Sequence, residues 1–272
     1  MYALPSAPLS VGGVVDDAIK LFRSSFTRCW IFSAIIGVLL LGMQLVLLLA
    51  MPGLAAPGRP DATKTLAALG SPGTIGLFIG LYLLVIFVSL VCYGGMLTRQ
   101  AAIARGDESV TLARAFATGV RRFPGMLLAA LLCILAIVAG LILLIIPGIW
   151  VMVRLYLWMA AMFADDAGAL GSLETSWRLT KGHWWRAVAI LSVTMVLFVV
   201  VSIAFNLVAG VIAGVSRVKP VDLQLISASF QALCYTIGYP FLTAAWLVMY
   251  HDFKLRREGG DLASRLGALS SA

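Results

Sequence analysis

The most informative segment of the chain is Leu141–Arg186, which reads LILLIIPGIWVMVRLYLWMAAMFADDAGALGSLETSWRLTKGHWWR. An apolar run is interrupted by Pro147-Gly148, the next apolar run contains a single charged residue, Arg154, and a polar segment follows. A single helix over residues 125–164 would be roughly 60 Å long, about twice the thickness of the hydrocarbon core of a bilayer. The segment therefore predicts a tight helical hairpin, with Pro147 at the first position of its second helix.

The composition of the whole chain indicates an integral membrane protein. Of its 272 residues, 61% are hydrophobic and 12% are charged, whereas soluble domains have about 45–50% apolar and about 25% charged residues. Apolar runs long enough to form spanning helices recur along the chain. We predict an all-α polytopic fold with one membrane domain, residues 1–250, and a loose cytoplasmic tail, residues 251–272. The six transmembrane helices are expected at about residues 31–51, 74–97, 125–146, 147–164, 187–215 and 223–250.

Three polar segments share the pattern of an amphipathic helix. Starting at Val15, Leu112 and Leu173, mostly apolar side chains recur at offsets 0, 4, 7 and 11, which places them on one helical face. We therefore expect two or three helices that lie in the membrane interface, the third capped by Gly171-Ser172. The pattern favours three tandem units, each an interfacial helix followed by a hairpin. The alternative is that the offsets only reflect amphipathic helices in general.

The basic residues predict the orientation. Fifteen of the 20 Lys and Arg residues fall on the side of the two termini, and four fall on the opposite side. This asymmetry predicts that both termini are cytoplasmic. The formal net charge is +8, but the basic residues cluster at the ends of apolar runs, so we expect no nucleic-acid partner.

Arg154 is the only charged residue inside a predicted span, and charges at such positions are frequently functional. One interpretation is that its side chain extends to the interface opposite the termini. The other is a buried role, such as pairing with a lipid phosphate. Basic and aromatic residues before the third and fifth spans would lie among anionic headgroups. The candidate lipid or substrate contacts are Arg154, Arg122, Lys181, Trp184, Trp185 and Arg186.

The remaining polar residues favour structural roles. The four cysteines are isolated from one another, so we predict neither a disulfide framework nor a zinc site. The acidic and histidine side chains of one connection match no ligand spacing, and we interpret them as solvated or capping groups: Asp165, Asp166, Glu174 and His183. Three amides within spans are expected to form hydrogen bonds between helices: Gln44, Asn206 and Gln231. We predict no catalytic residues, no cofactor and no metal.

Several short motifs support a family resemblance. They are Pro147-Gly148-Ile149-Trp150, Arg154-Leu155 and Leu173-x-x-Ser176-x-x-Leu179-Thr180-x-Gly182-x-Trp184-x-Arg186. With them, residues 110–200 resemble the glycerophosphoryl diester phosphodiesterase membrane-domain family and the related YciC-like bacterial inner-membrane proteins. The resemblance implies a multi-span module of the bacterial inner membrane. Phosphodiesterase activity is not expected, because only 22 residues follow Tyr250.

We therefore expect a non-catalytic inner-membrane module that engages membrane lipids, a protein partner or a second copy of itself. The alternative is a carrier for a lipid or another amphiphile. It would use a cavity between the helical hairpins, with Arg154 in contact with the headgroup.

Overall fold

The computed structural model of this chain describes residues 2, 4–50, 71–107, 109–216 and 220–270. Within these ranges the chain forms helices and turns, and no strand. The helices are α1 (Val11–Ala50), α4 (Pro72–Ala104), α5 (Leu112–Leu143), α6 (Ile145–Leu155), α7 (Trp158–Ala164), α8 (Ala169–Thr180), α9 (Trp184–Ser216) and α10 (Pro220–Ser270).

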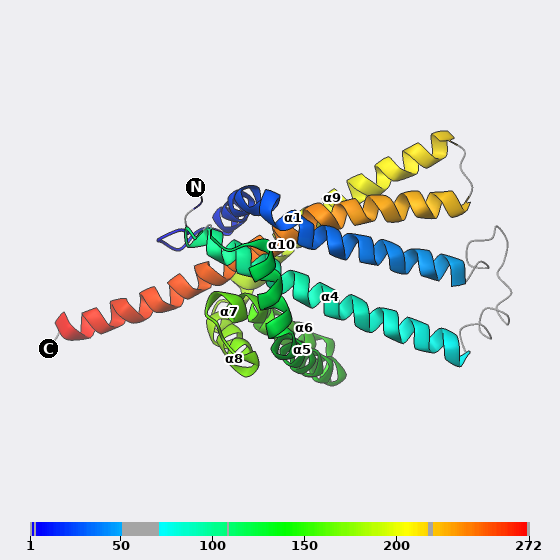
Figure 1. Cartoon of the computed structure of the whole chain (residues 1–272). Helices are drawn as coiled ribbons and strands as arrows, with labels where there is room; N and C mark the ends of the chain where they lie inside the picture. Colours follow the sequence, from blue (N-terminus) through cyan, green and yellow to red (C-terminus); the bar gives the residue numbers. More distant parts are fainter. Residues whose placement is uncertain (1, 3, 51–70, 108, 217–219, 271–272) are drawn as a thin grey trace.

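Four long helices, α1, α4, α9 and α10, extend from a compact region and spread apart toward the opposite side of the molecule (Figure 1). We call the compact side, which includes Arg105, Asp165, Arg186 and Asp252, the charged end, and the opposite side the far end. Six stretches of the described chain are long and apolar enough to cross a membrane: Val11–Leu47, Pro72–Ala104, Leu112–Leu143, Ile145–Ala164, Trp184–Ile212 and Asp222–Gly259. The predicted all-α class with six such helical stretches is confirmed.

The hairpin predicted at Pro147-Gly148 is present between α5 and α6. A single residue, Leu144, separates the two helices, and its backbone is extended, with φ −170° and ψ 157°. The α-carbons of Gly140 and Gly148 lie so close that a Cβ on either would meet the other helix or its side chains. Pro147 is the third residue of α6 and not the first. The N–H groups of the first helical turn have no acceptor within the helix, so the helix loses no hydrogen bond through the N–H that proline lacks.

Two of the three predicted interfacial helices are not separate helices. The segment that starts at Val15 is continuous with α1, and the segment that starts at Leu112 is continuous with α5. No residue with positive φ interrupts either junction, whereas Gly182, with φ +85°, separates α8 from α9. The predicted cap at Gly171-Ser172 was wrong, because α8 begins at Ala169, after Gly168.

Helix α10 contains a proline in its interior, Pro240, that changes its hydrogen bonding. Pro240 has no N–H to donate to the carbonyl of Thr236, one turn earlier. The hydroxyl of Ser33 on α1 donates to that carbonyl instead, at 2.7 Å. The amide of Gln100 on α4, which is fully buried, donates to the Pro240 carbonyl at 2.8 Å. These two bonds fasten α1 and α4 to the middle of α10.

Close packing of α4 on α5 depends on glycine. A Cβ at Gly119 of α5 would overlap the carbonyl oxygen of Val91 on α4, and Gly94 lies beside the same crossing. Beyond this core, α10 stays helical to Ser270, through the residues that were predicted to form a loose tail. That part of α10 projects past the charged end (Figure 1).

Candidate functional site

Arg154, the charged residue within a span, fastens α6 to α8. Its Nη1 donates to the carbonyl of Trp177 at 3.0 Å. The guanidinium carbon lies 4.6 Å from the ring centre of Trp150 and 4.9 Å from that of Trp177. The Arg154 carbonyl accepts a hydrogen bond from Ser176 of α8 at 2.8 Å. Two aromatic faces and a backbone carbonyl thus hold the side chain against α8, at the charged end. The interpretation that it extends toward the opposite interface was wrong.

Arg122, the second predicted contact, fastens α5 to the end of α7. Its Nη1 donates to the carbonyl of Met162 at 2.5 Å, and its guanidinium carbon lies 5.5 Å from the ring centre of Phe163. It also pairs with the carboxylate of Asp166, which has a positive φ of 59°. The side chain therefore holds the turn after α7 in place.

Arg186 belongs to a buried ionic cluster that we did not predict from the sequence. Its Nε and Nη2 donate to the carboxylate of Asp252 at 3.1 and 2.9 Å, and Nε of Arg256 donates to the same oxygen at 3.2 Å. The Leu9 amide donates to Asp252 Oδ1 at 2.8 Å, and the Leu9 carbonyl accepts from Arg186 at 2.6 Å. Asp252 is fully buried. A carboxylate followed by a basic residue four positions later was the only sequence signal for this cluster.

The other predicted contacts have fewer interactions. Lys181 is exposed just after α8, and Trp185 is 78% exposed, while Trp184 is partly buried and packs edge-on against Trp185 with ring centres 4.7 Å apart. The six predicted residues therefore do not form one site. Three arginines hold helices together, and Lys181 and Trp185 face the surroundings.

The acidic residues of the α7–α8 connection have separate partners. Asp165 accepts hydrogen bonds from Lys254 at 2.8 Å and from the Tyr250 hydroxyl at 2.7 Å. Partial burial opposes ionisation, but these two hydrogen bonds outweigh it and hold the pKa of the Asp165 carboxyl below its ordinary value. The His183 ring packs on Phe253, and Glu174 is exposed. Within the described part of the chain, no three His, Cys, Asp or Glu residues are arranged to hold a metal ion.

A further candidate site is a groove between α1, α9 and α10 toward the far end. We call it the carboxamide groove, because its lining includes four side-chain amides: Gln44, Asn206, Gln224 and Gln231. The cavity has a volume of about 560 Å³, and Leu40, Leu41, Ala228 and Tyr235 supply apolar walls. An adjoining cavity of about 240 Å³ continues between Gln44 and Gln224.

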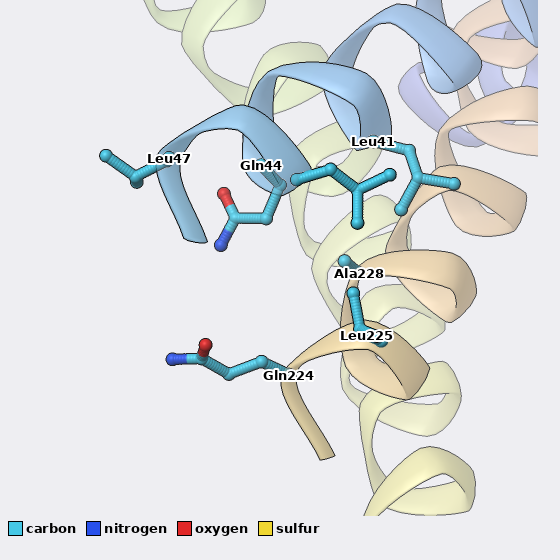
Figure 2. Close-up of a pocket in the computed structure, with 7 residues that line it drawn as sticks. Leu41, Gln44, Leu47, Gln224, Leu225 and Ala228 are labelled. Atoms are coloured by element: carbon cyan, nitrogen blue, oxygen red, sulfur yellow. The ribbon is translucent and has the colours of Figure 1, made fainter. Parts of the chain in front are cut away.

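The amides of the carboxamide groove are of two kinds. Asn206 Nδ2 donates to Gln231 Oε1 at 3.0 Å, so the predicted hydrogen bond between helices is confirmed for this pair. Gln44 and Gln224 are exposed, and neither side chain forms a hydrogen bond with another described residue. Figure 2 shows both amide groups on the open side of the gap between the two helices, with Gln44 directed toward α10.

The depth of the groove follows from the length of α1. Gln44 lies 16 residues beyond Arg28, the last charged residue of that helix, which corresponds to about 24 Å. The hydrocarbon core is about 30 Å thick, so Gln44 lies in the half of the membrane next to the far end. At that depth an amide without a partner costs several kcal/mol. The geometry is therefore suited to a ligand that offers hydrogen-bonding groups to the two free amides and apolar groups to the leucines.

Comparisons with known proteins place the chain among membrane proteins. The sequence profile described as "Domain of unknown function (DUF7847)" matches residues 33–249. One similar protein is the "UPF0259 membrane protein plu2479" of Photorhabdus laumondii, which is 34% identical over 91 residues, or 34% of this chain and 35% of that protein. The chain thus matches about a third of that relative's length. No solved structure matches. The predicted resemblance to bacterial membrane proteins is confirmed at this level, and the link to the phosphodiesterase membrane domain stays a prediction.

Proposed function

The chain belongs to the DUF7847 family, and from this premise we propose that it is a non-catalytic, multi-pass membrane module that binds a glycerophospholipid in the carboxamide groove. The observation that carries the proposal is the pair of exposed amides, Gln44 and Gln224, which line one cavity together with leucines. Ester carbonyl oxygens of a glycerophospholipid accept hydrogen bonds from amide N–H groups. Its acyl chains match the leucines and alanine that complete the wall.

The groove selects by hydrogen bonding and shape and not by charge. No Asp, Glu, Lys or Arg is among the described residues that line either cavity. An anionic headgroup therefore gains no ion pair there, and the ligand class is defined by its glycerol ester region. This differs from a carrier that holds a phosphate through Arg154, whose guanidinium is already engaged with Trp150 and Trp177.

The orientation that we propose places the charged end in the cytoplasm of a bacterial inner membrane. The excess of Lys and Arg on the side of the termini supports it. The carboxamide groove would then open into the periplasmic leaflet. Lys181 and Trp185, both exposed at the charged end, would anchor the module among cytoplasmic headgroups.

Native mass spectrometry of the protein in a mild detergent tests the proposal. Titration with phosphatidylethanolamine and with phosphatidylglycerol measures the affinity for each lipid. The double variant Gln44→Leu/Gln224→Leu loses two hydrogen bonds from side-chain amides to the lipid, each of about 0.6–1 kcal/mol. We therefore expect it to bind both lipids roughly tenfold more weakly than the parent.

Ser229→Leu is the matched control, since Ser229 is an exposed polar residue of α10 outside the groove. It should bind both lipids as the parent does, and so should Arg154→Ala. Equal lipid binding by the parent and the double Leu variant would refute the proposal. A stoichiometric second protein with no bound lipid would favour the partner hypothesis instead.

A further inference from the structure

The α5–α6 hairpin extends only a short way beyond α7. Helix α6 has 11 residues, Ile145–Leu155, which correspond to about 16 Å. On the other arm, Met126 and Ala129 of α5 pack in one buried cluster with Met159 and Met162 of α7. Only the part of α5 from Ala130 to Leu143 extends beyond α7, which is about 21 Å. Measured from the turn to the level of α7, both arms are shorter than the roughly 30 Å hydrocarbon core.

The base of the hairpin lies at the charged end. Arg154, at the end of α6, is held by Trp177 of α8. Helix α8 exposes Glu174 and Arg178 and is followed by the exposed Lys181, so it lies at the level of water and headgroups. The turn of the hairpin ends well short of the far end reached by α1, α4, α9 and α10 (Figure 1).

The side chains of the turn are suited to hydrocarbon. Ile142, Leu143 and Ile146 are 80%, 76% and 79% exposed. No charged residue occurs between Phe123 and Val153. Two backbone bonds close the turn: Leu144 N donates to the Gly140 carbonyl at 3.0 Å, and the Leu144 carbonyl accepts from Gly148 N at 3.3 Å.

We infer that α5 and α6 form a re-entrant hairpin that enters and leaves the membrane at the charged end. Its exposed apolar turn is an interaction surface for the acyl chains of the adjacent leaflet alone. The crossings are then α1, α4, α9 and α10, and the hairpin occupies one leaflet beside them. Both ends of the hairpin stay on the side of the termini, so the distribution of basic residues is the same as for six crossings.

Nitroxide depth measurements on the full chain in phosphatidylcholine–phosphatidylglycerol vesicles test the inference. A label on Leu144→Cys reports the turn. Labels on Gly73→Cys, at the far end of α4, and Gly168→Cys, at the charged end, report the two surfaces, and both positions have open space for a side chain. The native cysteines are buried, and the parent chain measures their background labelling.

We expect the Leu144 label to collide more with oxygen and less with a water-soluble nickel complex than either reference label. An impermeant maleimide added to both sides of the vesicles should label Gly73→Cys and Gly168→Cys and fail to label Leu144→Cys. Ile142→Cys, two residues away and 80% exposed, repeats the measurement if Leu144→Cys does not fold. A turn label as accessible to nickel as the Gly73 label would place the turn in water on the far side and overturn the inference.

Discussion

Replacement of Asp252 by Asn tests the ionic cluster that joins the N-terminal segment to α9 and α10. The carboxylate is fully buried and accepts hydrogen bonds from Arg186, from Arg256 and from the Leu9 amide. An asparagine keeps the size of the side chain and one acceptor for Leu9. It removes the negative charge, so two guanidinium groups face each other without compensation.

The expected cost is about 2–3 kcal/mol in the free energy of unfolding. Breaking a buried ion pair costs about 3–5 kcal/mol, because one partner is left desolvated. The estimate is lower here because the side chains of Arg186 and Arg256 are 17% and 27% exposed, and water partly solvates them once the carboxylate is gone.

Reversible unfolding by SDS in mixed micelles measures this difference. Glu258→Gln is the control, since Glu258 is 63% exposed and 4.0 Å from Lys254, and it should change stability by less than about 0.5 kcal/mol. The double variant Asp252→Asn/Arg256→Gln should be more stable than Asp252→Asn, because it removes one uncompensated charge. Equal stability of Asp252→Asn and the control would refute the view that this carboxylate holds the charged end together.

Two further predictions concern the helix crossing and the α7–α8 connection. Gly119→Ala should destabilise the protein by about 1–3 kcal/mol in the same unfolding assay, because the new methyl group overlaps a backbone oxygen of α4. Gly125→Ala is the control, since this glycine lies one to two turns later and has open space around it. It should be neutral or stabilising by up to about 1 kcal/mol. The lowered pKa of Asp165 means that its ion pair stabilises the fold above the ordinary carboxyl pKa of about 3.9, and that this contribution is lost as the pH falls through the folded-state pKa. Asp165→Asn should therefore cost about 1 kcal/mol at pH 7 and progressively less below about pH 4, and an equal cost at pH 7 and pH 3 would contradict this assignment.

The sequence predicted the features that depend on neighbouring residues. The hairpin at Pro147-Gly148 follows from the length of the apolar run and from the residues that interrupt it. The separate helix α8 follows from its amphipathic pattern, and the structure adds that Gly182 permits the positive φ at its end. The same pattern at Val15 and Leu112 was read as separate helices, yet nothing local ends those helices before the spans begin.

Side-chain partners could not be read from the sequence, because they come from distant segments. The direction of Arg154 depends on Trp177, which α8 brings back to α6. The role of Asp252 depends on Leu9, more than two hundred residues earlier. Gln44 was expected to bond to another helix, but the spreading of α1 from α10 leaves its amide open in the groove.

The sequence by itself determined the all-helical membrane class, the number of apolar helices and the position of the tight turn, because a hydrocarbon solvent allows few backbone structures and sets their length. Only the tertiary structure decided which charges are paired and which amides stay open. It also decided how deeply the α5–α6 arms extend, because these depend on crossing angles and close contacts between helices far apart in the chain.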